Sequence, residues 1–386
     1  ATLQNFNISV GITDDFMRRV ETDALWELKS PKTGKAVASL KAIDIWEKIL
    51  ECAWATGDPG LVFLDAINRQ NTLPGLGAIE STNPCGEVPL LDFESCNLGS
   101  INLSKMLVNK TLDWRKLSQT VQTGIRFLDN VISTNHYILS DVRDTTLQNR
   151  KIGLGLMGWA DLLMLLEIPY ASMEAIALAK KLMKFVKTES YKASALIALE
   201  KGVFPSWDKS VFFPNKKMRN ATCNSIAPTG TISVLANTSY SIEPLYALAY
   251  KRDGILGNKT QFEVNGVFKH KMEQLGFWGE TLQEAIKAEG SIQTLTHIPK
   301  SIRRIFETSH EIPWKYHLLH QKAFQDFTDN AVSKTINLPA STRVDEVREI
   351  YMEAWKLGLK GVTIYRDGSK AKQVLQRCNA NVAGVC

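Results

Sequence analysis

The feature that most constrains this chain is a short segment in which reactive polar side chains stand at alternate positions. The segment is Ser81-Thr82-Asn83-Pro84-Cys85-Gly86-Glu87. In an extended backbone successive side chains point to opposite faces, so Asn83, Cys85 and Glu87 would share one face. Pro84 disfavours a helical conformation at Asn83, and Gly86 adds no side chain to the other face. We therefore predict an extended loop tip that presents an amide, a thiol and a carboxylate side by side.

These three groups, with a second thiol at Cys96, have the composition of a reactive site. A thiol can act as a nucleophile or in one-electron chemistry, a carboxylate as an acid or base, and an amide as a hydrogen-bonding orienter. Other roles stay open from the residues alone. Most free cysteines are small buried hydrophobic residues, a loop glutamate is usually solvated, and asparagine before proline commonly makes an Asx turn.

Size, charge and cysteine content narrow the class of protein. The 386 residues, 44% of them hydrophobic, can bury the core of one large domain or of two smaller ones. The net charge of +6 is spread along the sequence, which argues against a nucleic-acid partner and is compatible with a mildly basic pocket for a phosphorylated small molecule.

No apolar run approaches the roughly 20 residues of a membrane span, so we expect no membrane partner. The six cysteines include no Cys-x-x-Cys pair, which argues against a zinc ribbon, and we assign no metal ligands. Sparse cysteines indicate a reducing, cytoplasmic environment.

Strand and helix patterns alternate along the chain, which indicates an α/β fold. Thr13-Asp14-Asp15 and Ser172 have the residue types of helix N-caps. The polar stretch 251–300 is interpreted as an excursion from the core. The expected strands are 5–10, 221–227, 242–250, 331–337 and 360–365, and the expected helices are 42–56, 115–135, 173–200 and 343–357.

A G-x-G-x-x-G pattern occurs at residues 153–158, but we reject a dinucleotide site there. That fingerprint needs an apolar strand immediately before it, and residues 140–150 are polar. We predict instead that the glycines allow close helix packing and that a buried helix continues from Trp159 to Leu165.

Several motifs in a fixed order resemble the catalytic subunits of ribonucleotide reductases. They are Asn83–Glu87, Glu94–Leu103, Arg150–Gly155, Ala227–Ser233 and Gly361–Ser369. The first is most similar to the adenosylcobalamin-dependent (class II) branch. A single tyrosine, Tyr365, stands where the oxygen-dependent branch carries an adjacent pair, and no glycyl-radical motif is visible. A class I type subunit, which needs a separate radical-generating subunit, remains the alternative.

The resemblance implies a ten-stranded α/β barrel of two five-stranded halves with a finger loop through its centre. Residues 1–375 would form the C-terminal part of this barrel, as an incomplete barrel with the finger loop at about 80–103, and residues 376–386 an irregular tail. Ala1 opens directly onto a strand-like segment, and family members carry a long N-terminal region before it. We therefore expect a fragment that gives no sustained turnover alone and recovers it when the missing N-terminal portion is supplied.

The resemblance also implies the roles of the reactive residues. Cys85 would hold the thiyl radical that abstracts the 3′-hydrogen of the substrate, Glu87 would accept the 3′-hydroxyl proton, and Asn83 would hold the ribose hydroxyls. Cys96 would be one member of a redox thiol pair whose partner lies upstream of Ala1. A thiyl radical needs a dry site, so we expect these residues in one enclosed cavity, with Cys96 close to Cys85.

A second motif implies a phosphate site. The turn concentrates backbone N–H groups at the start of an expected helix, which favours an anion, although a capped helix without a ligand is an equal alternative from the turn alone. Glu243-Pro244 also fits the family without an assigned role. Cys378 and Cys386 could be relay thiols, but we favour a frayed tail. The predicted phosphate-binding residues are Pro228, Thr229, Gly230, Thr231, Ile232 and Ser233.

The implied partners are a ribonucleotide, with a diphosphate favoured, adenosylcobalamin, a thioredoxin-like reductant and, in the complete enzyme, a second copy in a homodimer. A nucleotide-binding fragment without turnover is the non-enzymatic alternative.

Overall fold

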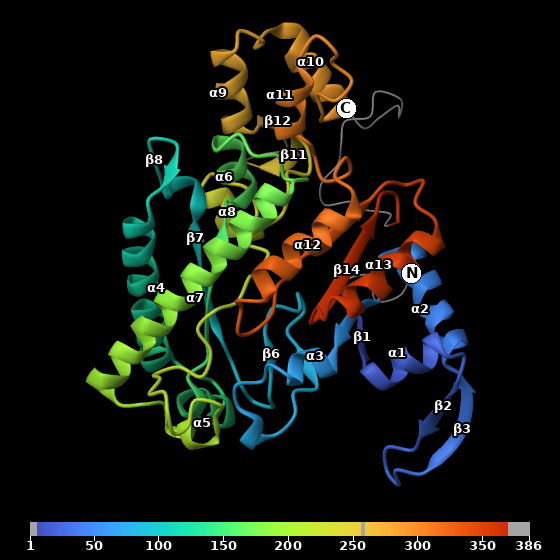
Figure 1. The fold of residues 1–386 in the computed structure, drawn as a ribbon, viewed down its shortest axis with the longest axis vertical. Coiled ribbons are helices and arrows are strands. Elements are labelled where there is room, and N and C mark those ends of the chain that lie inside the picture. Colours follow the sequence, from blue (N-terminus) through green and yellow to red (C-terminus); the bar gives the residue numbers. More distant parts are fainter. Residues whose placement is uncertain (1–5, 256–258, 370–386) are drawn as a thin grey trace.

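A four-stranded mixed sheet forms one side of the computed structural model, which describes residues 6–255 and 259–369 (Figure 1). Strands β1 and β4 are parallel, β14 is antiparallel to β4, and β13 is parallel to β14. Helices α1, α2 and α13 share an apolar core with this sheet. The elements are β1 (Ser9–Ile12), β4 (Gly60–Phe63), β14 (Gly361–Arg366), β13 (Thr335–Leu338), α1 (Asp14–Glu21), α2 (Ala42–Thr56) and α13 (Val344–Lys356).

A second group of strands lies on the other side of the molecule (Figure 1). Strands β7 (Asn97–Asn102) and β10 (Ile152–Met157) pair in parallel and pack against α4 (Trp114–Thr134), which in turn packs on α7 (Met173–Lys201). Isolated bridges between Leu154 and Asn224 and between Ile226 and Val332 extend this pair toward β13. In the described part of the chain the strands do not close into a barrel. The incomplete α/β barrel expected from the resemblance is thus confirmed.

Between the two groups runs the hairpin of β5 (Ser81–Thr82) and β6 (Pro89–Leu90), which carries the predicted finger loop. A longer hairpin, β2–β3, projects from the body of the molecule (Figure 1). The remaining elements of this part are α3 (Leu64–Asn68), β2 (Leu25–Lys29), β3 (Ala36–Lys41), β8 (Leu107–Val108), β9 (Thr111–Leu112), α5 (Ser140–Asn149), α6 (Trp159–Leu165), α8 (Gly230–Leu235), α12 (Trp314–Gln325) and the 3-10 turns Pro74–Leu76, Leu103–Lys105 and Pro205–Lys209.

The predicted excursion at 251–300 forms a separate lobe with an apolar core of its own, above the rest of the molecule in Figure 1. The strand predicted at 242–250 is wrong, because only its last two residues belong to β11. Pro244 lacks the N–H that a strand ladder requires. The lobe contains β11 (Ala249–Ile255), β12 (Lys259–Val264), α9 (Gly266–Gln274), α10 (Glu280–Glu289) and α11 (Lys300–Ile305).

The strongly periodic helices form where the sequence predicts them. Helix α2 buries Ala42, Trp46, Ile49, Leu50 and Ala53, which recur at the spacing of one helical face. The hydroxyls of the predicted N-caps accept backbone N–H groups three residues on, at 3.2 Å for α1 and 3.1 Å for α7. Helix α13 and strand β14 also match their predicted ranges within one residue.

The interpretation of the glycine motif as a helix-packing surface is wrong, because Gly153 and Gly155 lie in strand β10. A Cβ atom on Gly155 would lie 2.2 Å from the backbone oxygen of Ser225, so the glycine allows the extended segment at 224–226 to approach. The segment before the motif is helix α5, not a strand, and the buried helix continuing from Trp159 is α6.

We expect Gly155→Ala to lower the free energy of unfolding by about 2–3 kcal/mol, because the new methyl group would force β10 away from Ser225. Urea unfolding monitored by circular dichroism would measure the change. Gly266→Ala is the matched control, since no atom lies within 4 Å of its added Cβ and it opens helix α9. Equal stability of both variants would contradict the close approach described here.

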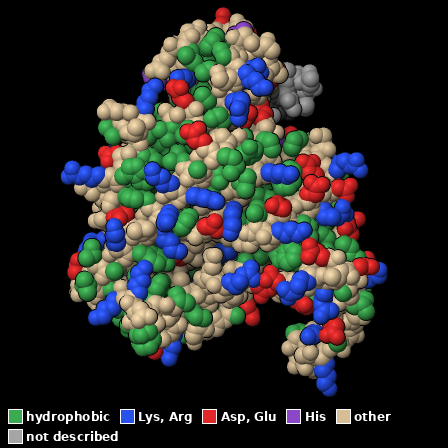
Figure 2. Space-filling model, in the orientation of Figure 1, with side chains coloured by type: hydrophobic (Ala, Val, Ile, Leu, Met, Phe, Trp, Pro, Cys, Tyr) green, Lys and Arg blue, Asp and Glu red, His purple; other side chains and the backbone are tan. Residues whose placement is uncertain are grey.

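The surface carries mixed charge. Figure 2 shows Lys and Arg side chains scattered over the visible face among Asp and Glu. In the described residues, every helix is too short or too polar to cross a bilayer.

Candidate active site

The finger loop is a tight turn rather than the extended tip that the sequence predicts. The Asn83 N–H donates to the Val88 oxygen at 3.2 Å, and the Gly86 N–H donates to the Asn83 oxygen at 3.0 Å. Pro84 and Cys85 therefore occupy the two central positions of a four-residue turn, where proline is favoured. Gly86 follows with φ of 80°, a conformation that suits glycine.

The predicted enclosure of the three reactive side chains is wrong for this structure. Cys85 is exposed at the outer end of the turn, whereas Glu87 is only 3% exposed. The turn breaks the alternation of faces that an extended segment would have, so Cys85 is exposed while Glu87 is buried. Partial burial and the Glu87 charge both raise the pKa of Cys85, which means that thiol and carboxylate remain electrostatic neighbours.

Glu87 is held through its backbone. Its carbonyl oxygen accepts hydrogen bonds from the Ala331 N–H at 2.9 Å and from the Ser225 hydroxyl at 2.8 Å. The buried carboxylate oxygen Oε2 has no hydrogen-bond partner among the described residues. An orphaned buried carboxylate oxygen is available to a ligand, and such an atom in a native structure calls for a functional explanation.

Asn83 uses its side-chain oxygen inside the loop, where Oδ1 accepts the Val88 N–H at 2.9 Å. Both predicted roles of this residue remain compatible with that bond. The side-chain oxygen stabilises the turn, and the amide nitrogen is the group that a ligand could contact.

Cys96 stands directly before β7 and is partly buried. Burial is the largest cause that raises the pKa of its thiol to about 12, and the charges of Glu94 and Glu87 add to the increase. The Glu87 carboxylate thus acts on both thiols. Glu87 is therefore an electrostatic neighbour of both Cys85 and Cys96, while Cys85 itself is exposed.

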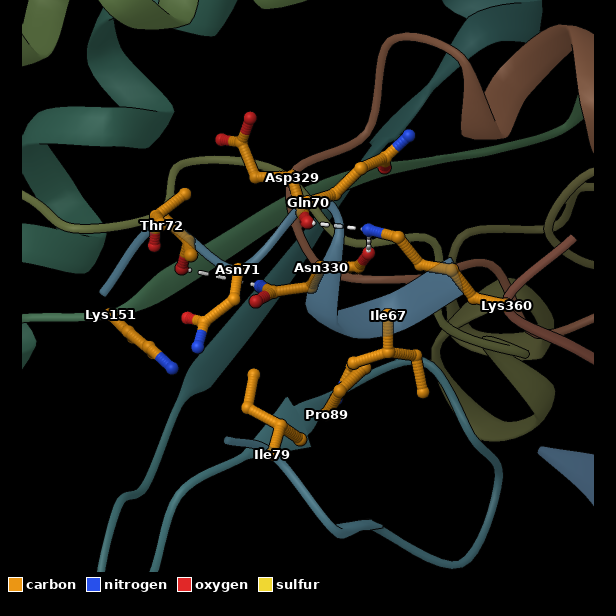
Figure 3. Close-up of a pocket in the computed structure, with 11 residues that line it drawn as sticks. Ile67, Gln70, Asn71, Thr72, Ile79, Pro89, Lys151, Asp329, Asn330 and Lys360 are labelled. Atoms are coloured by element: carbon orange, nitrogen blue, oxygen red, sulfur yellow. Dashed lines mark hydrogen bonds between the residues drawn. The ribbon is translucent and has the colours of Figure 1, made fainter. Parts of the chain in front are cut away.

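Figure 3 shows the residues around a small polar cavity of about 10 Å³, room for about one water molecule. The cavity lies near Cys96, because Asn330, which lines it, is 3.9 Å from the Cys96 sulfur. Pro89 of the finger hairpin, Lys151, Asn330 and Lys360 are among its lining residues. From the sequence, Lys151 is predicted only as part of the Arg150–Gly155 motif, and Asn330 and Lys360 are not predicted as site residues. The only sequence signal for Lys360 is its charge inside an otherwise apolar segment, and Asn330, which follows two other polar residues, has no such signal.

The predicted phosphate turn lines a groove of about 170 Å³ together with the strand that follows Cys96. Helix α8 begins at Gly230, inside the motif and earlier than the expected start just after it, and Thr229 before the helix has φ of 57°. Ser233 is buried, and its hydroxyl pairs with that of Thr229 at 2.7 Å. Pro228 and Ser233 are not among the groove-lining residues, which are Leu98, Gly99, Ser100, Ala227, Thr229, Gly230, Thr231 and Ile232.

Among the described residues, Cys52 and Glu243 lie outside the finger hairpin. Cys52 is partly buried on α2, and Cys378 and Cys386 lie outside the described residues. Glu243 forms an ion pair with the buried Lys334 and accepts the Thr335 N–H at 2.8 Å, which gives it a structural role. No cluster of three potential metal ligands occurs within residues 6–255 and 259–369.

The family of the chain follows from comparison with known proteins. The model of the ribonucleotide reductase barrel domain matches residues 1–217 and 213–365, so the chain belongs to this family. A solved structure, the alpha subunit of the class Id ribonucleotide reductase of Actinobacillus ureae, superposes with a TM-score of 0.77. The two chains are 23% identical, and the match covers 94% of this chain and 65% of that one, which establishes the shared fold.

Two relatives narrow the comparison to one branch of the family. The vitamin B12-dependent ribonucleoside-diphosphate reductase of Thermoplasma acidophilum is 48% identical over 375 residues, which cover 97% of this chain and 49% of the relative. The enzyme of the same name from Mycobacterium tuberculosis strain H37Rv is 47% identical over 373 residues, covering 97% and 52%. The chain thus spans about half the length of the curated relatives it matches.

Proposed function

We propose that this chain carries the reaction centre for the radical reduction of ribonucleotides to deoxyribonucleotides. The observation that carries the proposal is the buried Glu87 carboxylate, with one orphaned oxygen and an electrostatic influence on both Cys85 and Cys96. A base that is an electrostatic neighbour of two thiols suits a reaction that moves a hydrogen atom, a proton and two electrons. The names of the two B12-dependent relatives support the same reaction.

Each residue has one role in the proposed reaction. The Cys85 sulfur, as a thiyl radical, takes the hydrogen atom from C3′ of the ribose and returns it at the end. Glu87 accepts the proton of the 3′-hydroxyl while the 2′-hydroxyl leaves as water, and the Asn83 amide holds the ribose hydroxyls. Cys96 and a second thiol supply two electrons and two protons and become a disulfide. Ribonucleotide and dithiol thus yield deoxyribonucleotide, water and disulfide.

The exposure of Cys85 fits a radical source that approaches from outside the hairpin. When bound, adenosylcobalamin supplies a carbon-centred radical, and Cys85 and Gly86 at the outer end of the turn are the residues that would face it. The proposal further includes a diphosphate substrate, a thioredoxin-like reductant, a cytoplasmic location and a homodimer in the complete enzyme. A class I type subunit with a separate radical-generating protein is the alternative within the family.

One observation favours a second candidate, nucleotide binding without turnover. The thiol of Cys85 is exposed, and a thiyl radical open to solvent would be quenched. In that case the groove beside α8 would bind nucleotide, and no reduction would follow.

A chimera separates these candidates. Residues 1–375 would replace the matching part of the Thermoplasma acidophilum reductase, and deoxyribonucleotide formation would be measured with adenosylcobalamin and a dithiol. We expect turnover by the chimera. Nucleotide binding without any product would support the second candidate, and activity without adenosylcobalamin would contradict the B12-dependent assignment.

The predicted phosphate site gives a separate prediction for this chain. Titration with a ribonucleoside diphosphate should shift the backbone amide resonances of Gly230 and Thr231, because both residues line the groove at the start of α8. Gly279, which opens helix α10 elsewhere, is the control and should not respond. Saturating nucleotide without a shift at Thr231 would rule out the phosphate assignment.

A further inference from the structure

We propose that Lys151 and Asn330 are positioning residues that hold the Cys96 sulfur and stabilise its thiolate. The proposal rests on the proposed function, in which Cys96 is a redox thiol. Neither residue is in the set predicted to act on the substrate, and their placement beside this sulfur comes from two separate elements of the fold.

Strand pairing places Lys151 next to Cys96 in the fold. Ile152 pairs with Asn97 as the first pair of the parallel β10–β7 ladder, so Lys151 and Cys96 each stand one residue before the start of these neighbouring strands. An added Cβ on Gly153 would lie 3.5 Å from the Cys96 sulfur, which shows how closely β10 passes.

The ammonium group of Lys151 is fixed by a buried ion pair. Its Nζ lies 2.5 Å from Oε2 of Glu94, and the two side chains are 2% and 1% exposed. Glu94 also accepts the Leu91 N–H at 2.7 Å and the Asn149 amide at 2.7 Å. Because the Glu94 carboxylate accepts three donors, two of which lie just before β10, it fixes the segment that leads into Cys96 to the start of β10. We call the Glu94–Lys151 pair the clasp.

Asn330 approaches the sulfur from the opposite segment of chain. Its Nδ2 lies 3.9 Å from the Cys96 Sγ and 3.3 Å from the Thr222 hydroxyl. Figure 3 shows Asn330 among the residues that line the neighbouring cavity. The Asn330 N–H donates to the Asn224 oxygen at 3.1 Å, and its carbonyl oxygen accepts from the buried Lys360 ammonium. The amide is therefore held in place before it meets the sulfur.

The charges that face Cys96 act in opposite directions. Burial dominates and raises the pKa of the thiol, and the negative charges of Glu94 and Glu87 raise it further. The Lys151 charge and the Asn330 hydrogen bond lower it. These two groups therefore offset part of the burial cost of the thiolate form.

A stabilised thiolate matters when the oxidised site is reduced again. An external dithiol attacks the disulfide at the partner sulfur, a new S–S bond forms, and Cys96 leaves with the electron pair of the broken bond. The second thiol of the reductant then attacks this mixed disulfide, so the partner sulfur leaves as a thiolate and the reductant ends as a disulfide. The Cys96 and partner thiolates take up the two protons that the reductant releases. A leaving thiol departs faster when its thiolate is more stable, so Lys151 and Asn330 would accelerate this step.

The test measures alkylation of Cys96 by iodoacetamide in residues 1–386 at pH 9, resolved by peptide mass spectrometry. Only the thiolate reacts, so each unit of pKa change alters the rate about tenfold. We expect Lys151→Met to slow Cys96 about tenfold, and Lys151→Arg to restore most of the rate because the charge returns. Asn330→Leu should slow it as well, and Glu94→Gln should accelerate it.

The two substitutions within the clasp should change the alkylation rate in opposite directions, and this distinguishes an electrostatic role from a loosened structure. Loss of packing alone would expose the thiol and accelerate alkylation in both Lys151→Met and Glu94→Gln. Lys334→Met, which removes another buried lysine paired with a glutamate, is the control and should leave Cys96 unchanged. Cys85 serves as an internal reference in every sample.

A wild-type rate at Cys96 in both Lys151→Met and Asn330→Leu would overturn the inference while leaving the proposed reaction intact. If Lys151→Met does not fold, Asn330→Leu and Glu94→Gln decide the question. Turnover by the chimera carrying Cys96→Ser would instead remove the proposed function on which the inference rests.

Discussion

Replacing Cys85 with serine in the chimera should lower deoxyribonucleotide formation at least about 10³-fold, as expected when the reacting group itself is removed. Serine is similar in size, but its O–H bond is too strong to yield the radical that the thiol provides. The exposed position of Cys85 means that this substitution should leave the fold unchanged. Product formation would be measured by chromatography, with folding checked by circular dichroism.

Cys52→Ser is the matched control for this prediction. Cys52 is also a free cysteine, but it lies on α2, outside the finger hairpin. We expect this variant to keep wild-type turnover. Turnover by the Cys85→Ser chimera at a comparable rate would show that another group carries the radical step.

Much of the fold could be predicted because local signals agree with tertiary packing. Helices α2, α7 and α13 have regular apolar faces, and the caps at Thr13 and Ser172 make the hydrogen bonds that their residue types predict. The incomplete barrel is predicted from the resemblance to ribonucleotide reductases. Periodicity alone shows only alternating strands and helices.

The predictions that failed depend on contacts far apart in the sequence. Gly153 and Gly155 belong to a strand because the segment at 224–226 passes within van der Waals contact of them, and no local pattern reports that approach. A strand is predicted at 221–227, but in the structure this segment makes only two isolated bridges, at Asn224 and Ile226. Buried strands with glycine at alternate positions resemble helix-packing motifs in composition, which is why the wrong element was chosen.

The candidate site, like the fold, could be predicted only in part from the sequence. The spacing of Asn83, Cys85 and Glu87 predicts that they share one loop, and in the structure they lie in the finger loop. Spacing could not show that Pro84 and Cys85 form the centre of a turn, which separates an exposed thiol from a buried carboxylate. Asn330 could not be found at all, because it reaches Cys96 across 234 residues of chain.

Removing the carboxylate of Asp129 should be strongly destabilising, although this residue lies outside the finger loop. We expect Asp129→Ala to lower the free energy of unfolding by about 3–5 kcal/mol, because it leaves a buried cation unpaired. The Asp129 side chain is fully buried and lies 2.7 Å from Arg150, which is 4% exposed. Lys201 and Arg219 face the same carboxylate at 3.7 and 3.4 Å.

The effect should extend to the site, since Arg150 directly precedes Lys151 of the clasp. Asp129→Asn keeps an acceptor for the Arg150 guanidinium and should lose less stability than alanine. Asp208→Ala is the control: it breaks an exposed pair with Lys209 at 3.1 Å, which contributes at most about 1 kcal/mol. Urea unfolding of the three variants would rank them. An Asp129→Ala chain as stable as Asp208→Ala would mean that solvent or a neighbouring group already neutralises Arg150, and that β10 is anchored by its apolar contacts alone.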